Sequence, residues 1–248
     1  MEILTTQNLS KRFGGLVAVN DVSLKVREGR LTSLIGPNGA GKTTLFNLLT
    51  GLMKPDAGRI HFRQVDITAY PPHRIVKEGV ARSFQIVNIF GELTLLENVR
   101  VAVQVQKGHG LEMFASVNSS SFHEVNEEAA AIVKATGLGG KERIIAKNLS
   151  YGDKRILEIA IALASKPRLL LMDEPTSGLA SRETAKMKEF IQNLAKELTI
   201  LLIEHDMNIV LSISDHIAVL HQGRVIAEGG PDAIRQNADV QEAYLGGL

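Results

Sequence analysis

The clearest chemical signal in the sequence is a glycine-rich segment at residues 36–43. It reads Gly-Pro-Asn-Gly-Ala-Gly-Lys-Thr and fits the pattern G-x-x-x-x-G-K-[ST]. Glycines let the backbone curl so that successive N–H groups, and the N-terminus of a following helix, face phosphate oxygens. The segment follows the apolar run 31–35 and precedes the helical pattern 44–49, which is the context that such a loop requires. It therefore predicts a nucleotide phosphate site, against the alternative of an ordinary glycine-rich turn.

Two side chains of this loop add chemistry to its backbone. Lys42 would place positive charge at the outer phosphates, and Thr43 would offer its hydroxyl to Mg²⁺. The predicted nucleotide-binding residues here are Gly36, Pro37, Asn38, Gly39, Ala40, Gly41, Lys42, Thr43 and Thr44.

A second signal is the apolar run 169–172, which ends in Asp173 and Glu174. An aspartate at the carboxyl end of such a strand can hold a metal ion or its water shell, and the next acid can activate an attacking water. By itself the pattern is more typical of an ordinary acidic turn at the end of a strand. Beside a phosphate loop it predicts a metal residue, Asp173, and a catalytic base, Glu174.

Two further segments have simple local explanations. Ser150 precedes an apolar helical pattern, so it is typical of a helix N-cap, with Asp153 closing a capping box. His205 follows the apolar run 201–203 and, taken alone, is typical of a surface or capping histidine.

The elements that would position these residues alternate between strand and helix. Apolar runs bounded by turn residues predict strands at 3–7, 22–26, 31–35, 59–62, 80–84, 169–172, 199–203 and 217–220, and helical spacing predicts helices at 45–49, 156–163 and 184–194. This alternation predicts an α/β fold with a mostly parallel sheet.

Residues 91–150 differ from this pattern. Their apolar residues follow helical spacing, and capping boxes are predicted at Thr94–Glu97 and Ser121–Glu124. We expect a helical subdomain there, with a flexible excursion at 107–121, which is rich in Gly, Ser and Asn.

Composition removes several classes of function. The chain has no Cys, which excludes disulfides, thiolate metal sites and cysteine nucleophiles. Its net charge of +1 creates no field that would gather nucleic acid, so we expect no nucleic-acid partner. No apolar run approaches the roughly 20 residues that span a bilayer, and the first residues resemble no signal peptide, so a cytoplasmic location is expected.

Together, residues 36–43, 150–153 and 173–174 resemble the ATPases of ABC transporters. Residues 149–153, Leu-Ser-Tyr-Gly-Asp, occupy the place of the signature sequence LSGGQ, between the phosphate loop and the acidic strand. Tyr151 and Asp153 depart from it. By this resemblance, Ser150, Tyr151 and Gly152 contact the nucleotide of a second subunit.

The resemblance implies roles for other residues, in the same order along the chain. Gln85 would sense Mg²⁺ and the membrane subunit, His205 would lie near the γ-phosphate, and Phe13 would stack on adenine, with a place in the core as its alternative. Residues 177–180 occupy the D-loop position, where Ala180 lacks the usual side chain.

The implied fold is a P-loop NTPase cassette: a RecA-like core with a β subdomain at 1–90 and 151–248, an antiparallel β edge, and an inserted helical subdomain at about 91–150. Residues 80–85, 90–99 and 243–246 are most similar to the branched-chain amino-acid importer branch. This implies ATP and Mg²⁺ as cofactors, with Thr43, Gln85 and Asp173 at the metal. It also implies a second ATPase subunit, identical or not, two integral membrane permeases, an external solute-binding protein, and a peripheral place on the cytoplasmic face of the membrane.

Other functions remain open at this level. Within the family, urea or another amide is an alternative solute. A soluble P-loop phosphotransferase or GTPase would share residues 36–43 but would have no use for 150–153 or His205, and the chain lacks an N/T-K-x-D guanine motif. An ABC ATPase of DNA repair or translation usually has two cassettes or a long coiled coil, and this chain has neither.

Overall fold

The N-terminal part of the chain forms an antiparallel sheet. In the computed structural model, which describes residues 1–83, 89–108 and 120–245, β1 (Glu2–Phe13) lies between β2 (Leu16–Val22) and β5 (Ala57–Phe62). β6 (Val65–Asp66) pairs with β5, and β3 (Lys25–Arg27) pairs with β1. The predicted single strand 22–26 is wrong, because β2 ends at Val22 and β3 begins only at Lys25.

A second, mostly parallel sheet carries the centre of the molecule. Its order is β11 (Arg224–Gly229), β10 (His216–His221), β4 (Leu31–Ile35), β9 (Thr199–Ile203), β8 (Leu169–Asp173) and β7 (Val80–Arg82). Only β11 runs antiparallel among these strands of the described chain. β4, β8 and β9 are buried along their whole length, which explains their continuous apolar sequences.

Helices and the antiparallel sheet cover the two faces of this central sheet. One face, with Leu34 and Leu201, packs against α1 (Lys42–Leu49) and the antiparallel sheet. The other face, with Leu170 and Leu202, packs against α5 (Tyr151–Leu163) and α6 (Ser181–Leu194). Because side chains alternate along a strand, β4, β7, β8 and β9 contribute to both layers.

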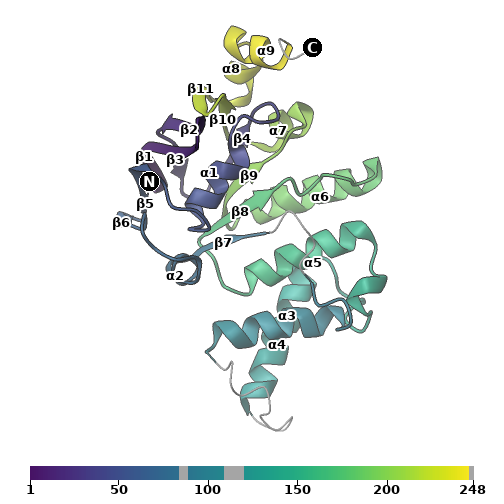
Figure 1. The fold of residues 1–248 in the computed structure, drawn as a ribbon. Helices are drawn as coiled ribbons and strands as arrows, with labels where there is room; N and C mark the ends of the chain where they lie inside the picture. The colour runs from purple at the N-terminus through teal and green to yellow at the C-terminus, as the bar shows by residue number, and fades with distance from the viewer. Residues whose placement is uncertain (84–88, 109–119, 246–248) are drawn as a thin grey trace.

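The helical part extends away from the sheets, as Figure 1 shows. α3 (Leu95–Gln106), α4 (Ser120–Ala135) and α5 share one apolar cluster, to which α3 contributes Leu95, Val99 and Val103 at intervals of one turn. The cluster therefore continues past residue 150 into α5. Most of the predicted excursion 107–121 lies outside the described residues.

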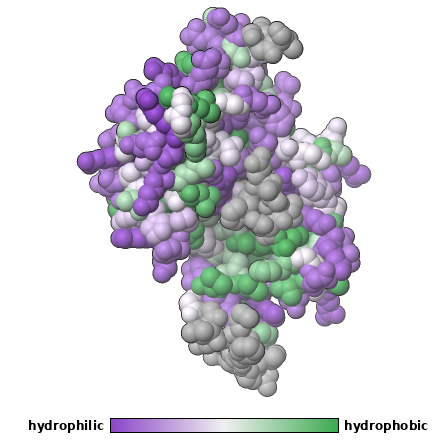
Figure 2. All heavy atoms as spheres, viewed as in Figure 1, coloured by the Kyte–Doolittle hydropathy of each residue, from purple (hydrophilic) through white to green (hydrophobic). Residues whose placement is uncertain are grey.

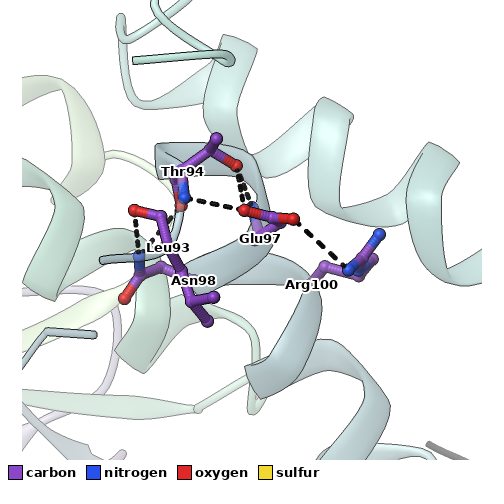
Figure 3. A network of polar contacts seen from close by, with 5 residues as sticks. All are labelled: Leu93, Thr94, Glu97, Asn98 and Arg100. Atoms are coloured by element: carbon purple, nitrogen blue, oxygen red, sulfur yellow. Dashed lines mark hydrogen bonds and ion pairs between the residues drawn. The ribbon is translucent and has the colours of Figure 1, made fainter. Parts of the chain in front are cut away.

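The start of α3 is fixed by the predicted capping box (Figure 3). Thr94 Oγ1 accepts from Glu97 N at 3.2 Å, and Glu97 Oε2 accepts from Thr94 N at 2.8 Å. The side chain of Asn98, which is buried, donates to the carbonyl of Thr94 at 2.9 Å and bonds both backbone groups of Phe90. The hydrogen bonds from the backbone N–H and the hydroxyl of Thr94 lower the pKa of Glu97. The second predicted box is wrong, because α4 already includes Ser121.

The remaining elements complete the core. α2 (Pro72–Glu78) leads into β7, a 3₁₀ turn (Ala146–Asn148) precedes α5, and α7 (Met207–Ile213) follows β9. α8 (Pro231–Arg235) and α9 (Ala238–Leu245) pack against β10 and β11. None of the helices within the described ranges is long and apolar enough to cross a membrane.

Candidate nucleotide site

Strand order brings the predicted residues to one edge of the central sheet. β9 lies between β4 and β8, and Ile203 is in register with both Leu34 and Asp173. Segments that follow these parallel strands therefore meet side by side at their carboxyl ends. Those segments are the glycine loop after β4, Glu204–His205 after β9, and Asp173–Glu174 at the end of β8. Gln85 follows β7, the next strand, and lies outside the described residues.

The glycine loop needs glycine where neighbouring backbone approaches it. Gly36 has φ 155°, and a Cβ there would lie 2.0 Å from the carbonyl oxygen of Leu220. At Gly41, with φ 103°, a Cβ would lie 2.2 Å from the carbonyl oxygen of Ala18. No side chain can enter at either position, so the loop is held between β2 and β10. Gly41 also leaves the N-terminus of α1 without a side-chain cap, as phosphate binding requires.

Lys42 is oriented by the loop itself. Its ammonium donates to the carbonyls of Gly36 at 2.7 Å and Pro37 at 3.0 Å, and the residue is buried. Burial lowers the pKa of Lys42, whereas the charges of Glu174 and Asp173 act to raise that pKa. The loop lysine and the two acids at the end of β8 therefore share one electrostatic environment.

Asp173 has two differently placed oxygens. Oδ2 accepts from Nη2 of Arg82 at 2.5 Å, whereas Oδ1 is buried and has no hydrogen-bond partner among the described residues. An unpartnered, buried carboxylate oxygen fits a cation or its water. No group of three or more His, Asp or Glu surrounds it within the described chain. Mg²⁺ binds through one or two carboxylates together with waters and nucleotide phosphates, so the free oxygen of Asp173 fits this ion.

Glu174 follows in an unusual backbone conformation. Its φ is 48°, in the left-handed region that non-glycine residues seldom adopt, and its N–H donates to the carbonyl of Ile203 at 2.9 Å. The turn stops the strand and redirects the chain after Asp173. Backbone strain of this kind is common where a side chain must be aimed for function.

Glu204 and His205 form the neighbouring part of the edge. Glu204 is fully buried, and its Oε1 accepts from the backbone N of Thr176 at 3.0 Å and from its hydroxyl at 2.6 Å. Oε2 has no hydrogen-bond partner in the described chain and lies 3.9 Å from Nδ1 of His205. Burial raises the pKa of Glu204. The side chain of His205 itself is exposed.

Phe13 ends β1, at the turn that joins it to β2. It is 45% exposed, so a place in the core is excluded. β2 passes directly against the glycine loop, because the carbonyl of Ala18 faces Gly41. β2 therefore runs from the turn beside Phe13 to the glycine loop.

Residues 150–152 lie at the start of α5. Ser150 is the N-cap of α5, and its Oγ accepts from Asp153 N at 3.1 Å, as predicted. Asp153 does not close the box; its carboxylate binds Lys141 at 2.7 Å. Tyr151 packs against Gly178, where a Cβ would lie 3.3 Å from the ring. Within one chain, this segment therefore lies beside residues 178–183.

Several residues of the site escaped the sequence analysis. Arg82 binds Asp173, Asn47 binds Arg82, and Thr176 binds Glu204, and no sequence pattern predicted Arg82, Asn47, Thr176 or Glu204 as part of the site. A signal existed for two of them: Arg82 is a charge at the end of the apolar run 80–81, and Glu204 is a charge directly after the apolar run 199–203. Arg82 falls within the predicted strand 80–84, and neither residue was predicted to belong to the site.

The fold and this edge define a P-loop ATP-binding cassette, and comparison with known proteins agrees. Residues 19–177 match the family model described as ABC transporter, and the chain belongs to that family of ATP-hydrolysing enzymes. Residues 224–247 match a second model, described as branched-chain amino acid ATP-binding cassette transporter.

Individual relatives and solved structures show which cassettes the chain is similar to. The chain is 45% identical over 250 residues to the high-affinity branched-chain amino acid transport ATP-binding protein LivG of Salmonella typhimurium, covering 98% of each chain. A crystal structure of an ATP-binding cassette of an ABC transporter in its ADP conformation has a TM-score of 0.87 at 34% identity and covers 99% of both chains. A dimeric cassette in a post-hydrolysis state, bound to ADP and phosphate, has a TM-score of 0.76 at 26% identity, with 92% of this chain and 98% of that chain covered.

Proposed function

We propose that this chain is the ATP-hydrolysing subunit that powers an importer of branched-chain amino acids. The observation that carries the proposal is the match of its C-terminal residues 224–247 to the branched-chain model, in a cassette whose phosphate loop adjoins Asp173 and Glu174. The solute itself would be bound by the membrane subunits and an external binding protein.

At the nucleotide, each group has a distinct task. Lys42 and the loop N–H groups bind the phosphates, and Phe13 stacks on adenine. Glu174 accepts a proton from the attacking water, and His205 donates a hydrogen bond to the γ-phosphate. Thr43, Asp173 and Gln85 would hold Mg²⁺, which when bound neutralises charge that develops on the phosphates.

Two subunits would close head to tail over two ATP molecules. Within one chain, Tyr151 lies against Gly178 and Gly152 lies against Glu183, and in the head-to-tail arrangement residues 150–152 would contact the nucleotide of the partner. Similarity to a dimeric cassette supports this arrangement. The second subunit is identical or a paralogue.

The membrane subunits would dock in an apolar groove. Its volume is about 220 Å³, and its lining includes Leu52, Ile75, Val76, Val80, Ile161 and Ala162. Leu52 and Val76 are 54% and 42% exposed, and Figure 2 shows hydrophobic side chains gathered across this face, between the sheets and the helical part. We expect an apolar helix of a permease to bind there, which would hold the chain peripherally at the membrane.

Reconstitution with permease subunits and the external binding protein tests the function. Leucine, isoleucine or valine should stimulate ATP hydrolysis in the vesicles, and urea should not. Stimulation by urea alone would assign the alternative solute. Because the chain has no cysteine, Leu52→Cys offers a unique cross-linking site, and failure to cross-link to a permease would contradict the docking groove.

A further inference from the structure

Arg82 connects three parts of the nucleotide site. It is the last residue of β7, and its guanidinium donates through Nη2 to Asp173 Oδ2 at 2.5 Å and through Nη1 to Asn47 Oδ1 at 2.7 Å. The guanidinium also lies 5.6 Å from the centre of the Phe46 ring. Asn47 and Phe46 lie on α1, the helix that begins at Lys42. One side chain therefore joins β7, the helix of the phosphate loop and the end of β8.

This contact determines which oxygen of Asp173 is available. The pair is almost inaccessible to water, with side chains 10% exposed for Arg82 and 1% for Asp173. A guanidinium is planar and donates in fixed directions, so it restrains a carboxylate more than a point charge does. Oδ2 is engaged, and Oδ1 is left buried without a partner among the described residues. Of the two oxygens, Oδ1 is therefore the one left to bind a ligand.

We propose that Arg82 is a positioning residue of the metal site: it fixes Asp173 against α1 so that Oδ1 faces the cation carried by the nucleotide. This inference rests on the proposed role of Asp173 in holding Mg²⁺. Arg82 also lines the apolar groove together with Val80 and Ala81, so the groove and the metal site share this side chain. Groups that orient metal ligands typically contribute about 10–100-fold to metal affinity.

The test separates metal binding from nucleotide binding. For each variant, the affinity for Mn²⁺ is measured by electron paramagnetic resonance with a saturating non-hydrolysable ATP analogue, and the affinity for that analogue is measured by calorimetry in EDTA. Arg82→Met should weaken Mn²⁺ binding by about 10–100-fold. Analogue binding in EDTA should stay within about twofold, because Lys42 and the loop amides make those contacts.

Two further variants and a control sharpen the test. Arg82→Lys keeps the positive charge but loses the planar guanidinium. Asn47→Leu removes the hydrogen-bond acceptor that Arg82 has on α1. Each should weaken Mn²⁺ binding by less than Arg82→Met does. If Arg82→Met does not fold, these two variants carry the test. Arg30→Met is the matched control, since Arg30 forms an exposed ion pair with Asp215 at 3.1 Å, before β4 begins.

The outcomes distinguish this inference from the proposed function. Mn²⁺ affinity within about twofold of the parent in the Arg82 variants would overturn the inference, and so would a parallel loss of Mn²⁺ and of metal-free analogue binding, which indicates a purely structural role. Asp173→Asn is measured alongside. If that variant keeps its Mn²⁺ affinity, the metal role of Asp173 fails; if it loses affinity and the Arg82 variants do not, only the role of Arg82 fails.

Discussion

Glu174→Gln removes one carboxylate at the end of β8 and keeps the shape of the side chain. A positioned general base is worth about 10²–10⁴ in rate, which corresponds to about 3–5 kcal/mol in the activation barrier. Hydrolysis should therefore fall by that factor. Binding should not fall with it, because Glu174 is the acid whose charge most raises the pKa of Lys42. Removing that negative charge leaves Lys42 less compensated, so ATP should bind at least as tightly as in the parent.

Phosphate release at saturating MgATP and calorimetric ATP binding measure the two effects separately. Glu189→Gln is the matched control, since this substitution makes the same chemical change at an exposed position of α6. Its rate should equal that of the parent. A rate for Glu174→Gln within about tenfold of the parent would refute the assignment of Glu174 as the base.

The same variant tests the composite site. With hydrolysis blocked, the ATP-bound form should accumulate, and gel filtration with light scattering should detect an ATP-dependent dimer that EDTA or a substitution at Ser150 dissolves. A variant that stays monomeric with ATP, alone and with each paralogous subunit, would contradict the head-to-tail arrangement.

Three further changes have expected outcomes. Lys42→Ala removes a charge-assisted contact worth about 1.5–3 kcal/mol, so ATP affinity should fall by about 10–150-fold in calorimetry, and unchanged affinity would disprove the phosphate role. Phe13→Ala should weaken ATP binding by about 5–150-fold if the half-exposed ring stacks on adenine, whereas equal affinity would rule out stacking. Burial raises the pKa of Glu204 above 4.5, so the native state binds its proton more tightly than the unfolded state does, and the free energy of unfolding falls as pH rises from 4.5 through the native pKa. The Glu204→Gln variant has no carboxyl group to titrate and so does not lose stability in this way. The melting temperature of the variant minus that of the parent should therefore increase between about pH 5 and pH 8. A difference that stays constant would contradict a raised pKa of Glu204.

Much of this molecule follows from short segments of the sequence. The glycine loop, the apolar strands 31–35 and 199–203 and the capping box at Thr94 depend on residues close to one another in the chain, so local geometry determines them. The loop glycines could be predicted because backbone curvature around phosphate is a local requirement. Strand ends were predicted less well: β1 extends to Phe13, and β11 was not predicted at all, because its burial pattern is intermediate rather than clearly alternating.

The sequence by itself thus determined the class of the fold, the phosphate loop, the acidic strand end and the exposed histidine. Only the tertiary structure decided how these parts hold one another. Arg82 and Asp173 are 91 positions apart, and Thr176 and Glu204 are 28 apart, and each pair meets because neighbouring strands of the sheet end at the same edge. Likewise, Tyr151 reaches Gly178 only because α5 and α6 share one apolar layer. Such contacts depend on strand order, which arises from burial summed over the whole chain and leaves no signature in any short stretch of residues.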